Sequence, residues 1–157
     1  MDSHSRAPDE GPPGGFRPEY RTELPADVER IPDLLEELVR RGRAAGFPAR
    51  RLRFNFRVGV CEALANAMRH GASEEDASVR VEAAFSAARI EVTVTDPGGG
   101  FDPSRVPDPT TPENLTLSTG RGVFLIRKLM DRVEYNAVGN SLRMVLYARG
   151  GPAGEAK

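Results

Sequence analysis

The segment CEALANAMRHG, residues 61–71, carries three polar residues in register on an otherwise apolar helical pattern. Glu62, Asn66 and His70 recur every four residues, roughly 400° of an α-helix, and therefore share one side of it. A glutamate can act as a general base, and a neutral amide oxygen can be one of the few protein ligands of Mg²⁺ among phosphates and waters. An interhelical hydrogen bond of Asn66 and an ion pair of Glu62 with a nearby arginine are the structural alternatives, and both stay open at this point.

The segment DPGGG, which begins at Asp96, follows a run of alternating apolar and polar residues. Asp96 therefore lies where a strand stops, and a carboxylate held there can accept a hydrogen bond from an exocyclic amine such as that of adenine. Gly98 and Gly100 permit close approach of the backbone and positive φ angles. The alternative is a common Asp-Pro-Gly turn without a ligand.

The segment STGRGVFLIRKL, residues 118–129, places Gly120 and Gly122 immediately before an apolar helical pattern. Unpaired N–H groups and the dipole at such a helix start favour phosphate. Thr119 can cap the helix or donate to a phosphate oxygen. An ordinary glycine-rich helix entry is the alternative, because the segment has neither the lysine of the GxxxxGK[ST] loop nor the spacing of the GxGxxG motif.

The periodicity of apolar residues predicts the elements that position these groups. A weak first strand, two helices, a hairpin, a long loop of low periodicity, a short helix and a last strand follow one another. The first strand is expected at 16–24, and the two helices at 25–46, with a start near Pro32, and at 50–69. The hairpin pairs 79–85 with 90–96. The loop, the short helix and the last strand follow at 97–120, 121–133 and 141–148. Glu91 alternates with inward residues and is expected to point outward. The expected fold is α+β, a two-layer α/β sandwich whose mostly antiparallel sheet is covered on one face by helices.

Composition limits the number of domains and the class of partner. The 157 residues and net charge of −1 suit one domain, expected at 16–149 between a disordered tail, 1–15, and a flexible tail, 150–157. The single cysteine, Cys61, is expected to pack in the core and favours a cytoplasmic location. The sequence has no apolar run long enough to predict a membrane span. Its net charge is near zero and it offers no aromatic platform, so direct nucleic-acid binding is not expected.

Arginines are concentrated in one stretch of the predicted helices. Seven arginines and no acidic residue lie between Leu38 and Cys61. Such a stretch forms either a solvated face or a docking surface for an acidic partner, and both alternatives stay open. The seven are Arg40, Arg41, Arg43, Arg50, Arg51, Arg53 and Arg57.

The order of the three motifs resembles a known ATP-binding domain. E-x-x-x-N on a helix, a strand pair, D-x-G-x-G, a long loop and G-x-G opening a helix are similar to the domain shared by Hsp90, DNA gyrase B, MutL and sensor histidine kinases, the Bergerat fold. EALANAMRHG, DPGGG and GRGVFLIRKLMD are the matching segments. ELPADVERIPDLLEEL, GRGVFLIRKLMDRVEY and GNSLRMVL are most similar to bacterial anti-sigma factors that are also serine-protein kinases. The resemblance covers about residues 20–147.

The resemblance implies ATP and Mg²⁺ as cofactors. Asn66 would coordinate the Mg²⁺, Glu62 would be the catalytic general base for a substrate serine, and Asp96 would bind the adenine amine. A mobile lid would extend from Phe101 to Thr119. Among the other residues, Gly98 and Gly100 would shape the adenine pocket, whereas Thr119, Gly120, Arg121 and Gly122 would lie at the phosphates. Arg121 facing water, and His70 as a structural cap of its helix, are alternatives that stay open, and Arg105 is a weaker candidate for the site.

The resemblance also implies a function and partners. The expected protein is an ATP-binding anti-sigma regulator with serine/threonine-protein kinase activity. It would phosphorylate a serine of an anti-sigma antagonist and sequester a sigma factor, as a homodimer. A non-catalytic, ATP-gated module that only sequesters a sigma factor or another regulator is the alternative. A scaffold with a disused pocket is a third possibility, and the intact glycines and Asp96 argue against it.

Overall fold

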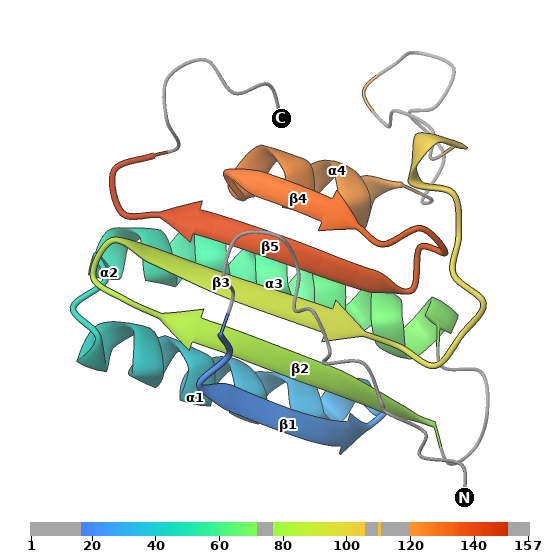
Figure 1. The fold of residues 1–157 in the computed structure, drawn as a ribbon, viewed down its shortest axis with the longest axis horizontal. Coiled ribbons are helices and arrows are strands. Elements are labelled where there is room, and N and C mark those ends of the chain that lie inside the picture. The colour runs from blue at the N-terminus through green and yellow to red at the C-terminus, as the bar shows by residue number, and fades with distance from the viewer. Residues whose placement is uncertain (1–16, 72–76, 106–109, 111–119, 151–157) are drawn as a thin grey trace, which may run out of the picture.

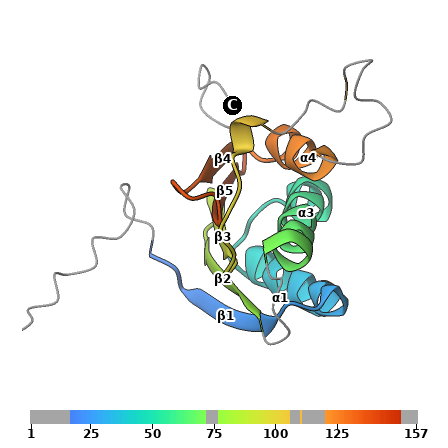
Figure 2. The same ribbon diagram turned by 90° about the vertical axis from the view of Figure 1, so that its right-hand side faces the viewer.

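The computed structural model describes residues 17–71, 77–105, 110 and 120–150 (Figure 1). Its five strands are β1 (Tyr20–Pro25), β2 (Ser78–Phe85), β3 (Arg89–Thr95), β4 (Arg132–Tyr135) and β5 (Ser141–Tyr147). They form one sheet in the order β1-β2-β3-β5-β4, in which every neighbouring pair is antiparallel. Helices lie on one face of the sheet (Figure 2), which confirms the predicted α+β sandwich. Apart from Gly150, the predicted tails lie outside the described residues, so the domain limits stay predictions.

The first helix, α1 (Ile31–Ala44), begins one residue before Pro32, close to the predicted start. Proline suits a first helical turn because its missing N–H has no intrahelical partner there. The core side of α1 buries an apolar stripe, as its spacing predicts; the stripe consists of Ile31, Leu34, Leu35, Leu38 and Val39. Within the described part of the chain, no helix combines the length and apolar character needed to cross a membrane.

The predicted second helix is a continuous helical run that changes type three times. It consists of α2 (Ala49–Arg51), the π-helical turn η2 (Leu52–Phe56), α3 (Arg57–Asn66) and the π-helical turn η3 (Ala67–Gly71). Leu52, Phe56 and Val60 are fully buried, although residues four apart drift about 40° per step around an ideal α-helix. Because π turns bond i→i+5 and are wider, they reduce this drift and keep the four-residue repeat on the core.

The prediction that the last helix continues to residue 133 is wrong. The helix α4 (Arg121–Leu129) stops at Met130, whose backbone is extended. The next residues form β4, in which Val133 lies opposite Met144 of β5. The side chain of Met130 is buried beside Gly59 of α3. Cross-strand pairing therefore overrides the helical spacing of Met130 and Val133, a long-range effect that local periodicity does not contain.

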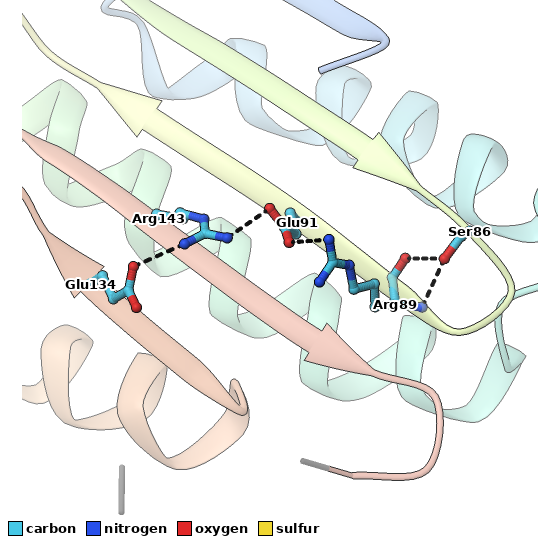
Figure 3. A network of polar contacts seen from close by, with 5 residues as sticks. All are labelled: Ser86, Arg89, Glu91, Glu134 and Arg143. Carbon is cyan, nitrogen blue, oxygen red and sulfur yellow. Dashed lines mark hydrogen bonds and ion pairs between the residues drawn. The ribbon is translucent and has the colours of Figure 1, made fainter. Parts of the chain in front are cut away.

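Glu91 points away from the helices but is not exposed to solvent. Only 2% of its surface is accessible. Its carboxylate oxygens lie 3.1 Å from Nη2 of Arg89 and 3.1 Å from Nη2 of Arg143, and Arg143 continues to Glu134 on β4 (Figure 3). The outward direction matches the expectation, whereas the burial does not follow from alternation along one strand. A buried charge needs partners, and here Arg89 of the same strand and Arg143 of the neighbouring strand β5 supply them.

Candidate functional site

A cavity of about 580 Å³ opens beside α3, α4 and the loop that follows β3. Its volume is within the range of small-molecule sites, roughly 300–1,000 Å³. Five of the predicted site residues line it together, namely Asn66, Asp96, Gly100, Gly120 and Gly122. Glu62, Gly98 and Arg121 are not among its lining residues, and Thr119 lies outside the described residues, as does most of the predicted lid.

Glu62 and Asn66 of α3 both face the first turn of α4. A Cβ atom on Gly122 would lie 2.9 Å from Oε2 of Glu62 and 3.1 Å from Nδ2 of Asn66. Of the two arginines that the structural alternative offers to Glu62, Arg57 and Arg69, Arg57 binds Glu36 of α1 at 2.6 Å. The two polar side chains of α3 therefore meet the glycine-rich helix entry, where a Cβ on Gly122 would displace their tips.

The entry of α4 has the features of an anion site. Gly120 is the N-cap residue, with a left-handed φ of 89°, and it turns the chain into the helix. The first N–H groups of a helix have no partner within it, and no acidic residue occupies this first turn. Gly120, Gly122 and Val123 line the cavity. The N–H groups at the start of α4 can therefore donate hydrogen bonds to phosphate oxygens that lie between α4 and the amide of Asn66.

Asp96 also lines the cavity, immediately after β3. Its Oδ1 accepts a 2.8 Å hydrogen bond from the Gly98 N–H, and its own N–H donates to the carbonyl of Asn140. Burial raises the pKa of Asp96, and the Gly98 N–H opposes this shift. The turn and the ligand site are therefore not exclusive, because one carboxylate both holds the turn and lines the cavity.

Gly100 has a structural role that its motif alone does not specify. Its φ is 78°, and a Cβ there would lie 1.7 Å from the carbonyl oxygen of Val138. Gly139 has a φ of 79°, and a Cβ there would lie 1.9 Å from the carbonyl oxygen of Phe101. The loop after β3 and the turn between β4 and β5 thus pack backbone to backbone.

Asn136 and Asn140 support this end of the cavity and were not predicted. Oδ1 of Asn136 accepts hydrogen bonds from the N–H groups of Gly139, Asn140 and Ser141. Nδ2 of Asn140 donates to the carbonyls of Asp96 at 3.2 Å and of Gly98 at 3.3 Å. The spacing N-x-x-G-N was a usable signal for a side-chain-stabilised turn, but its partner segment lies some forty residues earlier in the chain.

Apolar side chains complete the cavity wall between its two polar ends. Val94, Leu142 and Tyr135 line it, and the ring of Tyr135 packs edge to face against Phe101 at 5.2 Å. Burial raises the pKa of Tyr135. Such a wall suits a flat, largely apolar ring system whose edge carries hydrogen-bonding groups.

His70, Asp102 and Arg105 also line the cavity. His70 is exposed at the end of the helical run, so it borders the cavity whether or not it also caps the helix. Nε of Arg105 lies 3.4 Å from Oδ2 of Asp102, and both side chains are exposed. An exposed ion pair of this kind is weak, so the Arg105 guanidinium can exchange Asp102 for another anion.

The residues of the site suit a magnesium ion that takes most of its ligands from phosphate and water. No group of three His, Cys, Asp or Glu residues suited to a metal occurs among the described residues. The Asn66 amide and the Glu62 carboxylate are the polar groups beside the Gly122 backbone. Mg²⁺ commonly takes one or two protein oxygens and completes its octahedron with phosphates and water. The space that a Cβ of residue 122 would fill is left open for such a group.

Comparison with known proteins shows the family to which the chain belongs. Residues 24–146, which include every described residue named for the site, match the histidine kinase-like ATPase domain. The chain belongs to this family. The resemblance deduced from the three motifs is therefore confirmed, and ATP is the nucleotide that the family's description assigns to such a domain.

Two curated relatives are named serine-protein kinase RsbW. The chain is 32% identical over 92 residues to the protein of Bacillus pumilus (strain SAFR-032), which covers 53% of this chain and 57% of that protein. It is 32% identical over 101 residues to the protein of Listeria monocytogenes serovar 1/2a (strain ATCC BAA-679 / EGD-e), which covers 59% of this chain and 64% of that protein. The chain thus spans less than two thirds of the length of either relative.

Proposed function

We propose that this protein is an ATP-dependent serine/threonine-protein kinase that regulates transcription as an anti-sigma factor. In this proposal it transfers the γ-phosphate of ATP to a serine of an anti-sigma antagonist and sequesters a sigma factor. The observation that carries the proposal is the meeting of Glu62 and Asn66 at the Gly122 backbone, beside a cavity that Asp96 also lines. The names of the two relatives support the same activity and partners.

Each end of the cavity has its own task in this proposal. The Asp96 carboxylate accepts a hydrogen bond from the adenine amine, and Gly98 and Gly100 bring the backbone close to the ring. The N–H groups after Gly120, together with Thr119 and Arg121, bind phosphate oxygens. Asn66 supplies the amide oxygen for Mg²⁺, which when bound neutralises charge on the phosphates.

Glu62 acts as the base in the proposed transfer. Its carboxylate accepts the proton of the substrate serine, while the serine oxygen forms a bond to the γ-phosphorus and the bond to the ADP oxygen breaks. Glu62 is half-buried and lies one helical turn from Asn66, the proposed metal ligand. This spacing on one helix fixes the position of the base relative to the phosphates that bind near Asn66.

A phosphoryl-transfer assay with labelled ATP and the cognate antagonist tests the base. Glu62→Gln is expected to reduce transfer by about a hundredfold or more, because a general base contributes that much. Glu29→Gln, which changes an exposed carboxylate just before α1 in the same way, is the matched control and should transfer phosphate normally. Full transfer by Glu62→Gln would show that another group is the base.

Nucleotide binding is tested separately by melting. Saturating MgATP is expected to raise the melting temperature of the wild type and of Glu62→Gln alike, because a ligand of the native state stabilises it. Absence of a shift in the wild type would exclude an ATP site. A shift together with retention of a sigma factor, but no transfer to any protein, would replace the kinase by the ATP-gated binding module. A homodimer and a cytoplasmic location belong to the same proposal.

A further inference from the structure

The arginine-rich stretch separates in space into paired and unpaired side chains. Arg40 and Arg41 bind Glu37, Arg57 binds Glu36, and Arg51 binds Asp131 at 2.9 Å. Together with the hydrogen bond from Arg57, the charge of Arg43 lowers the pKa of Glu36. Arg50 and Arg53 are exposed and, within the described part of the chain, have neither an ion pair nor a hydrogen bond of the side chain. Their charge is not used inside this portion of the molecule.

Phe54 lies beside these two arginines and is the most exposed large hydrophobic side chain in the described residues, at 61%. Residues three and four apart on a helix are neighbours, so Arg50 shares its side of the helical run with Arg53 and Phe54. The opposite side carries Leu52 and Phe56, which are fully buried. We call Arg50, Arg53 and Phe54 the basic-aromatic patch.

The helical segment beneath the basic-aromatic patch is fixed to the end of α4. Nη2 of Arg51 binds Oδ2 of Asp131, whose side chain is only 9% exposed. Nδ2 of Asn55 donates a 2.9 Å hydrogen bond to the carbonyl of Leu129. The backbone that presents the patch is therefore ordered before any partner arrives, which lowers the entropic cost of binding.

The basic-aromatic patch is separate from the nucleotide cavity. None of its three residues lines the cavity. Figure 1 shows α2, where the patch begins, at the opposite end of the sheet from the point where β3 leads into the cavity loop. A ligand of the patch therefore does not compete with a nucleotide for the same groups.

We propose that Arg50, Arg53 and Phe54 form a docking surface for an acidic segment of a partner protein. Carboxylates of the partner bind the two guanidinium groups, and an apolar side chain of the partner covers the Phe54 ring. Two arginines and one ring are too few for a nucleic-acid footprint, which needs many phosphate contacts, and the chain has a net charge of −1. The proposal does not depend on the proposed kinase function.

A labelled peptide of alternating glutamate and leucine tests the surface by fluorescence anisotropy with the full chain. The wild type is expected to bind it, with affinity that falls as salt is added, and to ignore a peptide with glutamine in place of glutamate. Arg50→Glu/Arg53→Glu is expected to weaken binding about tenfold or more. Phe54→Ser is expected to weaken it several-fold without loss of thermal stability, since the ring is mostly outside the core.

Charge exchange and matched controls make the test decisive. A lysine-leucine peptide is expected to bind Arg50→Glu/Arg53→Glu but not the wild type. Arg17→Glu/Arg30→Glu changes two exposed arginines elsewhere by the same charge and should bind the acidic peptide normally. Equal loss in this control, normal binding by the patch variant, or a preference of the patch for a single-stranded oligonucleotide would overturn the proposal.

The two proposals fail separately. Patch variants should keep the melting shift with MgATP, whereas Asp96→Asn should lose that shift and still bind the acidic peptide. If self-association of the wild type disappears in Arg50→Glu/Arg53→Glu, the surface joins copies of this chain, and the proposed acidic partner is wrong.

Discussion

The two glycine-rich borders of the cavity resist substitution for different reasons. At the Asp96 end, Gly100 has a left-handed backbone, and its missing Cβ makes room for a backbone carbonyl of the β4–β5 turn. At the α4 end, Gly122 lies within the helix, and its missing Cβ makes room for the tips of two side chains, Glu62 and Asn66. A carbonyl held between two turns cannot move alone, whereas a carboxylate or amide can rotate.

The difference separates a glycine that maintains the fold from one that maintains the site. Gly100 joins two loops that the hydrogen bonds of Asn140 also connect. Gly122 joins no loops and leaves space where polar groups converge. Sequence motifs treat both glycines as ligand-binding residues, but only the contacts of each missing Cβ show which role dominates.

The largest expected effect comes from Gly100→Ala. A non-glycine residue in the left-handed region and a clash with the Val138 carbonyl together cost about 3 kcal/mol. We therefore expect a large fall in the urea midpoint, with nucleotide binding lost as well. If Gly100→Ala unfolds at the wild-type midpoint, the backbone-to-backbone packing described here is not present in solution.

Gly122→Ala is expected to separate stability from activity. Alanine gains about 1 kcal/mol of helix propensity over glycine, which offsets the displacement of two flexible side chains, so the urea midpoint should change little. Displacement of Glu62 and Asn66 should reduce phosphoryl transfer about a hundredfold, because small misplacements of catalytic groups are that costly. A stable variant with normal transfer would mean that the space beside Gly122 is not used.

Asp96→Asn gives a smaller, pH-dependent effect. Burial raises the pKa of Asp96, so the native state holds its proton more tightly than the unfolded chain. The associated stability is present below the ordinary aspartate pKa and is lost as the pH rises through the raised value.

Asparagine does not ionise, so without nucleotide Asp96→Asn should be slightly more stable than the wild type near neutral pH. The advantage should disappear on acidification towards about pH 4, and melting temperatures of both proteins across this range provide the measurement. The melting shift with MgATP should be lost in the variant at each pH where the wild type shows it. A variant less stable than the wild type at neutral pH would indicate that the ionised carboxylate stabilises the turn.

The smallest effect is expected for Gly99→Ala. Apart from its two chain neighbours, no atom of the described residues lies within 4 Å of a Cβ at this position, and its φ is not in the left-handed region. Stability should stay within about 0.5 kcal/mol of the wild type, as for most surface substitutions. A thermal melt beside Gly100→Ala makes this variant a control for the neighbouring glycine. A loss comparable to that of Gly100→Ala would mean that loop composition, rather than the specific contact, matters.

Local chemistry made much of the fold and site predictable. Glu62 and Asn66 lie four residues apart on one helix, and Asp96 ends a strand whose alternation is clear, so short segments contain the needed information. Long-range partners were not predictable in this way. Strand β4, the burial of Glu91 and the support from Asn140 each depend on a segment distant in sequence. The arginine stretch shows the same limit, because Glu36 and Asp131 decide which of its charges are used inside the molecule.

The π-helical turn at Leu52–Phe56 fixes the angle between the two halves of the long helix. If the same residues formed an α-helical turn instead, all later side chains would rotate by about 100° relative to the earlier ones, because a π turn takes up one extra residue. Leu52 could then remain in the core only if Glu62 and Asn66 turned away from Gly122. A change that many surface helices absorb would here uncouple the half of the helix that anchors the domain from the half that borders the cavity.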